Sequence, residues 1–78
     1  MQKDFELLNA FLSGEKIAGI KFRHNSSVAF IRADGTRCLG WIVSLTLNGP
    51  EPVYTVECGD GSGDVDVLES KLELIAAP

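Results

Sequence analysis

The chain has 78 residues, of which 45% are hydrophobic and 23% are charged, and its formal net charge is −4 at pH 7. This length predicts one domain over residues 1–78, and this composition excludes an intrinsically disordered chain. So few residues cannot both pack a core and wall a deep enzyme cleft, and an acidic total disfavours nucleic acid as a partner.

The first predicted element is an α-helix over residues 4–13. Its hydrophobic residues recur at helical spacing and form one stripe: Phe5, Leu7, Leu8, Phe11 and Leu12. Asp4 suits an N-cap or a place in the first turn, and Gly14 suits the C′ position that ends a helix. Because one face of this helix is apolar, we expect it to dock on the rest of the domain.

After Gly14 the hydrophobic period changes to two, which indicates β-strands. The predicted strands cover residues 18–23, 28–33, 36–47, 53–58, 65–68 and 72–75. Asp34-Gly35 predicts a two-residue hairpin turn, and Gly40 permits a bend or bulge in the long third strand. Five or six short antiparallel strands at this spacing predict a mainly β fold, a small barrel over residues 16–75 that carries an N-terminal helix.

The segment 59–64 is rich in glycine but matches no catalytic motif. It lacks the lysine of a P-loop and the glycine two places before serine that a nucleophile elbow needs. We interpret it as a hairpin tip that uses glycine for its positive φ angles. Weak calcium binding by Asp60, Asp64 and Asp66 stays open, whereas no motif predicts a cofactor, a catalytic residue or a metal site.

The two cysteines, Cys38 and Cys58, are too few for a disulfide framework. With His24 as the single histidine they also cannot complete a four-ligand zinc site. We expect both thiols to be reduced and structural, and a disulfide between neighbouring strands stays open for an exported chain. The sequence shows neither a signal peptide nor an apolar run long enough to span a membrane, so we expect a cytoplasmic protein.

The charges divide along the chain. Residues 16–37 hold five basic side chains against Asp34, and residues 38–78 hold seven acidic side chains against Lys71. Three interpretations stay open: a solvated surface of both signs, complementary faces that meet between subunits, or a basic face that binds phosphate. Together with the apolar residues that a small barrel leaves exposed, the division predicts a homo-oligomer, a dimer or a tetramer.

The second half of the chain resembles a known family. Gly40-Trp41-Ile42-Val43-Ser44 is similar to the Gly-Gln-Ile-Val-Gly strand of the plasmid-borne type II dihydrofolate reductases, and Tyr54-Thr55-Val56-Glu57 to their Tyr-Ala-Val-Glu. Val65-Asp66-Val67-Leu68 falls on their Val-Gln-Ile-Tyr, and Leu72-Glu73-Leu74-Ile75 on their closing Leu-Glu-Arg-Ile. The resemblance implies a Src-homology-3-like barrel, and the family's reductase is a homotetramer around a central pore.

The same resemblance points to a candidate site. The family binds folate and the nicotinamide cofactor through its Gln-Ile-Tyr segment and an upstream lysine. Here Asp66 and Leu68 replace the amide and the hydroxyl, and Arg32 lies at about the spacing of the lysine. Trp41 is either packed in a core or interface or a stacking platform for a small planar ligand.

We therefore predict a non-enzymatic binding or protein-interaction module of a bacterial accessory kind. Its candidate ligand- or partner-binding residues are Arg32, Trp41, Asp66 and Leu68. Two alternatives stay open: an enzyme like the type II dihydrofolate reductases, and a nucleic-acid- or ribosome-associated barrel.

Overall fold

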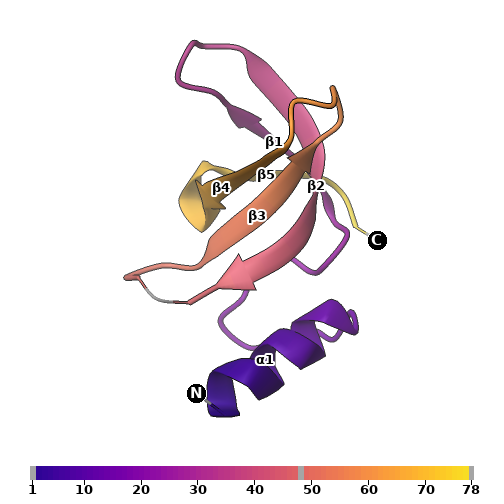
Figure 1. Ribbon diagram of the computed structural model, residues 1–78, viewed down its shortest axis with the longest axis vertical. Coiled ribbons are helices and arrows are strands. Elements are labelled where there is room, and N and C mark those ends of the chain that lie inside the picture. Colours follow the sequence, from indigo (N-terminus) through magenta and orange to yellow (C-terminus); the bar gives the residue numbers. More distant parts are fainter. Residues whose placement is uncertain (1, 48, 78) are drawn as a thin grey trace.

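The computed structural model describes residues 2–47 and 49–77 and consists of one helix and one antiparallel β-sheet (Figure 1). The elements in chain order are α1 (Gln2–Leu12), β1 (Ser27–Ile31), β2 (Arg37–Thr46), β3 (Val53–Cys58), β4 (Asp64–Leu68), the 3₁₀ turn η1 (Glu69–Lys71) and β5 (Glu73–Ala76). The strand order is β4-β3-β2-β1-β5, and the sheet is open, with β4 and β5 as its edge strands. The predicted mainly β fold with an N-terminal helix is thus confirmed.

The end of α1 follows the prediction made from Gly14. This glycine has a φ of 84°, and its N–H donates to the carbonyl of Phe11 at 3.0 Å. The N–H of Glu15 donates to the carbonyl of Ala10 at 3.1 Å, which completes a Schellman motif. At the other end the helix begins at Gln2, so Asp4 lies in the first turn and the N-cap interpretation was wrong.

The helix docks at one end of the sheet, but through a narrower contact than its sequence predicted (Figure 1). Phe11 is fully buried, and its ring lies 6.3 Å from the ring of Tyr54 and 5.8 Å from that of His24. Phe5 is 65% exposed and Leu12 is also exposed, although both belong to the predicted apolar stripe. Phe11 is therefore the one buried side chain among residues 5–12, and Leu7 and Leu8 are half-buried.

The strand predicted over residues 18–23 does not form. A turn with Gly19 at a φ of 81° interrupts the segment, and the N–H of Ile20 donates back to the carbonyl of Ile17. Phe22 is buried in the core and its N–H donates to the Tyr54 hydroxyl at 3.2 Å. Apolar and polar residues alternate over 18–23 because the apolar side chains of this irregular segment reach the core at intervals. The described chain has no strand that pairs with this segment.

A hairpin joins β1 and β2 where Asp34-Gly35 predicted one, but its turn is of another type. The N–H of Gly35 donates to the carbonyl of Arg32 at 2.9 Å, and the N–H of Arg32 donates to the carbonyl of Thr36 at 2.8 Å. Only Gly35, at 87°, has a positive φ here. The loop therefore has three residues and a glycine bulge, in place of the predicted two-residue turn.

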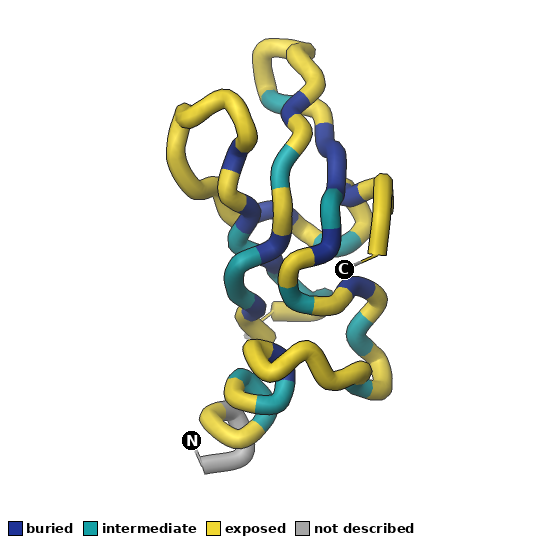
Figure 2. Tube along the Cα trace, turned by 90° about the vertical axis from the view of Figure 1, so that its right-hand side faces the viewer, coloured by how far each residue is buried: buried dark blue, intermediate teal, exposed yellow. Residues whose placement is uncertain are grey.

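A glycine is needed at position 40 because β2 and β3 approach each other closely there, and not because β2 bends. A β-carbon at this position would collide with the carbonyl oxygen of Glu57 on β3. The bulge in β2 falls further along, between Ile42 and Ser44. The buried residues lie mainly in β1, β2 and β3, whereas β5 and most of the loops are exposed (Figure 2).

Candidate functional site

A groove of about 460 Å³ lies between the end of β1 and β4. It is lined by residues 30–33, which end β1 and begin its loop, by residues 65–68 of β4, and by Lys71 of η1. β1 and β4 are not neighbours in the sheet, since β3 and β2 lie between them in the strand order. The curvature of the sheet therefore builds this groove from segments that are more than thirty residues apart.

Three of the predicted binding residues line this groove: Arg32, Asp66 and Leu68. Trp41 does not line it. This residue lies in the middle of β2, opposite Ser27 on β1 and Glu57 on β3. It is exposed, so the expectation that it packs in the core was wrong. The structure therefore separates Trp41 from the other three residues.

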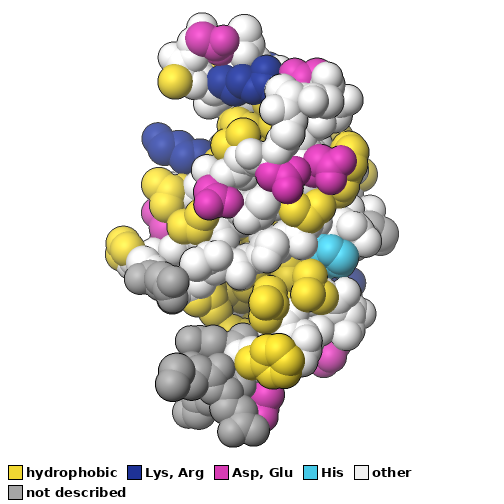
Figure 3. All heavy atoms as spheres, viewed as in Figure 1, with side chains coloured by type: hydrophobic (Ala, Val, Ile, Leu, Met, Phe, Trp, Pro, Cys, Tyr) yellow, Lys and Arg dark blue, Asp and Glu magenta, His cyan; other side chains and the backbone are white. Residues whose placement is uncertain are grey.

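The walls of the groove combine exposed apolar side chains with three charged ones. Ile31 is 64% exposed, and Val65 and Leu68 are each exposed by more than a third. Exposed hydrophobic groups of this kind, set among charged ones, also occur elsewhere on the surface (Figure 3). Apolar surface left in water costs free energy, so a groove lined in this way favours an occupant with apolar side chains.

The groove is also bordered by two strand edges that lack a partner strand in the described part of the chain. β4 pairs with β3 alone, as an edge strand. β1 pairs with β5 only from Ser27 to Ala29, so its outer edge has no strand beside it from Phe30 onward. Unpaired strand edges offer backbone N–H and C=O groups to an added strand.

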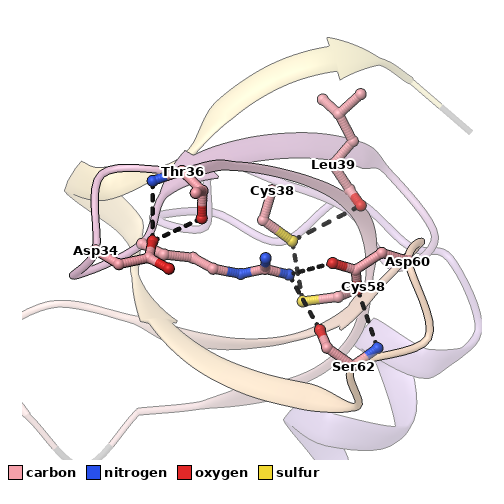
Figure 4. A network of polar contacts seen from close by, with 8 residues as sticks. Asp34, Thr36, Cys38, Leu39, Cys58, Asp60 and Ser62 are labelled. Atoms are coloured by element: carbon pink, nitrogen blue, oxygen red, sulfur yellow. Dashed lines mark hydrogen bonds and ion pairs between the residues drawn. The ribbon is translucent and has the colours of Figure 1, made fainter.

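Arg32 connects this groove to a polar network at the hairpin end of the sheet. Its Nη2 donates to Oδ2 of Asp60 at 2.9 Å and to Oγ of Ser62 at 3.0 Å, and the tip of the β3–β4 hairpin carries both acceptors. Asp60 also accepts the Ser62 N–H, at 2.9 Å, and the two hydrogen-bonding residues lower the pKa of the Asp60 carboxyl (Figure 4). Asp60 in turn raises the pKa of Arg32, which stays charged.

Two buried thiols lie directly beside this network. The Sγ atoms of Cys38 on β2 and Cys58 on β3 are 2.9 Å apart, and neither residue forms a disulfide (Figure 4). Burial raises the pKa of Cys38, and its neighbour Cys58 adds to that effect. Burial also opposes ionisation of Cys58, but hydrogen bonds from Cys38, Arg32 and Ser62 outweigh it and lower the pKa of Cys58.

The other polar contacts do not assemble a metal site. Asp66 accepts a hydrogen bond from the Thr55 hydroxyl at 2.8 Å, and Asp60 is held by Arg32. Within residues 2–47 and 49–77 no group of three or more potential ligands could hold a metal ion. The structure therefore does not support the calcium interpretation of Asp60, Asp64 and Asp66.

A second polar cluster lies at the opposite end of the sheet and is structural. The buried Tyr54 hydroxyl donates to Oε2 of Glu69 at 2.6 Å and accepts the Phe22 N–H, while the same carboxylate oxygen accepts the Lys21 N–H at 3.0 Å. Burial and the Glu69 carboxylate raise the pKa of Tyr54 well above its usual value. This cluster fastens the irregular segment before β1 to η1.

Sequence reasoning missed several residues of the groove and its network. Ile31, Val65 and Lys71 line the groove, and Asp60 and Ser62 position Arg32. The exposed apolar position at the end of β1 had no signal in the sequence pattern, because three consecutive residues before Ile31 are buried. The contact of Arg32 with Asp60 had no signal in the sequence, since 28 residues separate the two.

Comparisons with known proteins do not add to this picture. No family model, no curated protein and no solved structure matches the chain. In the part of the chain that the structure describes, no helix has both the length and the hydrophobicity needed to cross a membrane.

Proposed function

We propose that this chain is a non-enzymatic protein-interaction module that binds an extended polypeptide segment in the groove between β1 and β4. The observation that carries the proposal is an apolar groove between two strand edges without partner strands. A peptide added to such an edge gains main-chain hydrogen bonds, and its alternate side chains enter the groove.

The residues of the groove favour a segment with alternating apolar side chains and mixed charge. Ile31, Val65 and Leu68 provide the apolar contacts. Asp66 and Lys71 lie on the same walls with opposite charges, so an occupant with one basic and one acidic side chain matches both.

The same residues are less suited to the reductase alternative. The Nη2 of Arg32 already donates to Asp60 and Ser62, and Leu68 has no hydroxyl for a ligand. The ionised carboxylate of Asp66 would repel a folate tail or a cofactor phosphate. The nucleic-acid alternative loses support for a similar reason, because Arg32 pairs with Asp60 and Arg37 with Glu73 within the chain.

We also infer that the open sheet is of the Src-homology-3-like class and that the chain forms a dimer or tetramer. The class is supported by the meander from β1 to β4, by η1, and by the return of β5 to the side of β1. Self-association is supported by half-exposed Leu74 and Ile75 on the edge strand β5. Light scattering at micromolar concentration tests it, and a monomeric mass would contradict it.

A selection from a random peptide library tests peptide binding. The full chain is immobilised and the library is counter-selected against the Ile31→Asp and Leu68→Asp variants. We expect peptides with alternating apolar residues that shift the amide NMR signals of residues 30–33 and 65–68. Phe5→Asp is the matched control, since Phe5 is as exposed as Ile31 but lies on α1.

Two results would contradict the proposal. One is an equal recovery of peptides from the wild-type chain and from both groove variants. The other is a set of shifted amide signals that lies away from the groove. A folded Ile31→Asp variant is expected, because this side chain is mostly in solvent.

A further inference from the structure

The two cysteines form a close pair inside the hairpin end of the sheet. Their side chains are buried and their Sγ atoms lie 2.9 Å apart. A disulfide bond is about 2.05 Å long, so the sulfur atoms need to approach by only about 1 Å more to form one. We propose that Cys38 and Cys58 are a redox-active dithiol, which a small hydroperoxide converts into a reversible intramolecular disulfide.

The surroundings of the pair assign different roles to its two members. The thiolate is the form that reacts with peroxides. The Cys38 thiol is the donor within the pair, and the neighbouring Arg32 and Ser62 also lower the pKa of Cys58, which favours its thiolate. Cys58 is therefore the attacking residue, and Cys38 is the resolving residue.

A second groove gives a small oxidant access to the Cys38 side of the pair, and Cys58, whose Sγ lies 2.9 Å from that of Cys38, does not line this groove. The groove has a volume of about 400 Å³ and is lined by Cys38 with Arg37, Leu39, Gly59 and Asp60. Both cysteines are otherwise almost inaccessible to solvent. This access favours hydrogen peroxide over a bulky disulfide such as oxidised glutathione.

The proposed reaction has two steps. The Cys58 thiolate attacks one peroxide oxygen and the O–O bond breaks, which gives a sulfenic acid on Cys58 and releases the other oxygen as water after protonation. The Cys38 sulfur then attacks the Cys58 sulfur, the S–O bond breaks, and the leaving hydroxide takes the Cys38 proton to form a second water. One peroxide has taken up two electrons and two protons from the dithiol, and a dithiol reductant reverses the change by thiol–disulfide exchange.

Neither cysteine lines the groove between β1 and β4, so the inference does not rest on the proposed peptide binding. Arg32 is the one residue that takes part in both regions. It acts on the thiols as a positioning residue. An Arg32→Gln variant is expected to react severalfold more slowly with peroxide, and an Arg32→Lys variant is expected to recover part of the rate.

The test treats the reduced full chain with hydrogen peroxide and follows the intact mass and the number of free thiols. We expect both thiols to disappear together, the mass to fall by that of two hydrogen atoms, and dithiothreitol to restore both. No lysine or arginine lies between Cys38 and Lys71, so trypsin leaves both cysteines in one peptide. Cleavage after Glu57 with a glutamate-specific protease separates them unless the disulfide links the fragments.

Comparison with the unfolded chain decides whether the fold creates the reactivity. The native dithiol should be oxidised faster than the same chain in urea. Thiols that react more slowly than those in urea, disulfides between chains, or sulfinic acids without a disulfide would overturn the proposal.

Single variants test the two roles. In Cys38→Ser we expect a sulfenic acid on Cys58 that a dimedone probe captures, and in Cys58→Ser a slower reaction at Cys38. Faster labelling in Cys58→Ser would overturn the assignment of roles.

Discussion

The two ends of the sheet are covered by different kinds of contact. At the end that carries α1, the aromatic rings of Phe11, Phe22 and Tyr54 pack together, and the Phe22 and Tyr54 ring centroids lie 5.4 Å apart. At the hairpin end, Arg32 holds the tip of the β3–β4 hairpin by ionic and polar contacts over a pair of thiols. The first end is mostly apolar, with the buried Tyr54 hydroxyl bound to the Glu69 carboxylate, and the second is charged and nucleophilic.

We expect the helix end to contribute mainly to the stability of the fold and the hairpin end mainly to its chemical reactivity. Burial of aromatic surface stabilises the fold whatever the pH or the redox conditions, because it depends on area removed from water. Contacts among Arg32, Asp60 and two thiols change when a group gains or loses a proton or an electron. We therefore expect substitutions at the helix end to change the free energy of unfolding most, and substitutions at the hairpin end to change reactivity.

The largest expected effect is at the centre of the apolar end. Phe11→Ala should lower the free energy of unfolding by about 3–5 kcal/mol, because it removes a fully buried ring and leaves a cavity. Urea denaturation measures the change. Phe5→Ala is the control from the same helix and should stay within about 0.5 kcal/mol of the wild type. Similar losses for both variants would show that α1 docks by its whole stripe.

A smaller effect is expected where Gly40 of β2 lies against Glu57 of the neighbouring strand β3. Gly40→Ala should cost about 1–3 kcal/mol, since its β-carbon would collide with the Glu57 carbonyl and force the strands apart. Gly49→Ala is the control, because its β-carbon would lie at an ordinary 3.8 Å from the Glu51 carbonyl. If thermal and urea unfolding give equal stability for both variants, the close approach of the strands is wrong.

The buried hydroxyl should contribute a comparable or smaller amount. Tyr54→Phe keeps the ring but leaves the Phe22 N–H without its acceptor and removes a donor from Glu69. An unsatisfied buried donor costs about 1–3 kcal/mol. Hydrogen exchange should also speed up at the Phe22 amide. An unchanged exchange rate would mean that the segment before β1 is held by its apolar side chains alone.

The smallest effect on stability is expected at the hairpin end and depends on pH. The pKa of Asp60 is lower in the folded chain than the value of about 3.9 expected when unfolded. Its contribution to stability is therefore present above pH 4 and is lost as the pH falls further. Asp60→Asn should flatten the decrease of stability below pH 4 and change little at pH 7. If the stability of the Asp60→Asn variant falls as steeply below pH 4 as that of the wild type, Asp60 does not cause this loss of stability.

Local patterns predicted much of the chain because neighbouring residues decide local structure. Alternation over residues 53–58 placed Tyr54, Val56 and Cys58 on one buried face, and the structure confirms it. The same kind of alternation over 18–23 was misleading, because it reports which side chains reach the core and not whether a strand lies alongside. The hairpin at Asp34-Gly35 was predicted in place but not in turn type, since Asp34 keeps a negative φ and Gly35 alone takes the positive one.

The site was predicted in part. Arg32, Asp66 and Leu68 were named together and line one groove, but Trp41 was grouped with them and lies elsewhere. The error has a physical cause. The position of a residue in the sequence of a strand does not tell which part of a curved sheet surface its side chain will face. The same curvature brings residues 30–33 next to β4, although β1 and β4 are not paired.

The sequence by itself determined where α1 ends, where the hairpins fall and which face of residues 53–58 is buried, because these depend on residues close together in the chain. Only the tertiary structure decided that Arg32 meets Asp60, that Cys38 lies against Cys58, and that basic and acidic segments pair within one chain. Such meetings depend on strand register and on the curl of the sheet. Both are set by packing of the whole core, and no short stretch of sequence encodes them.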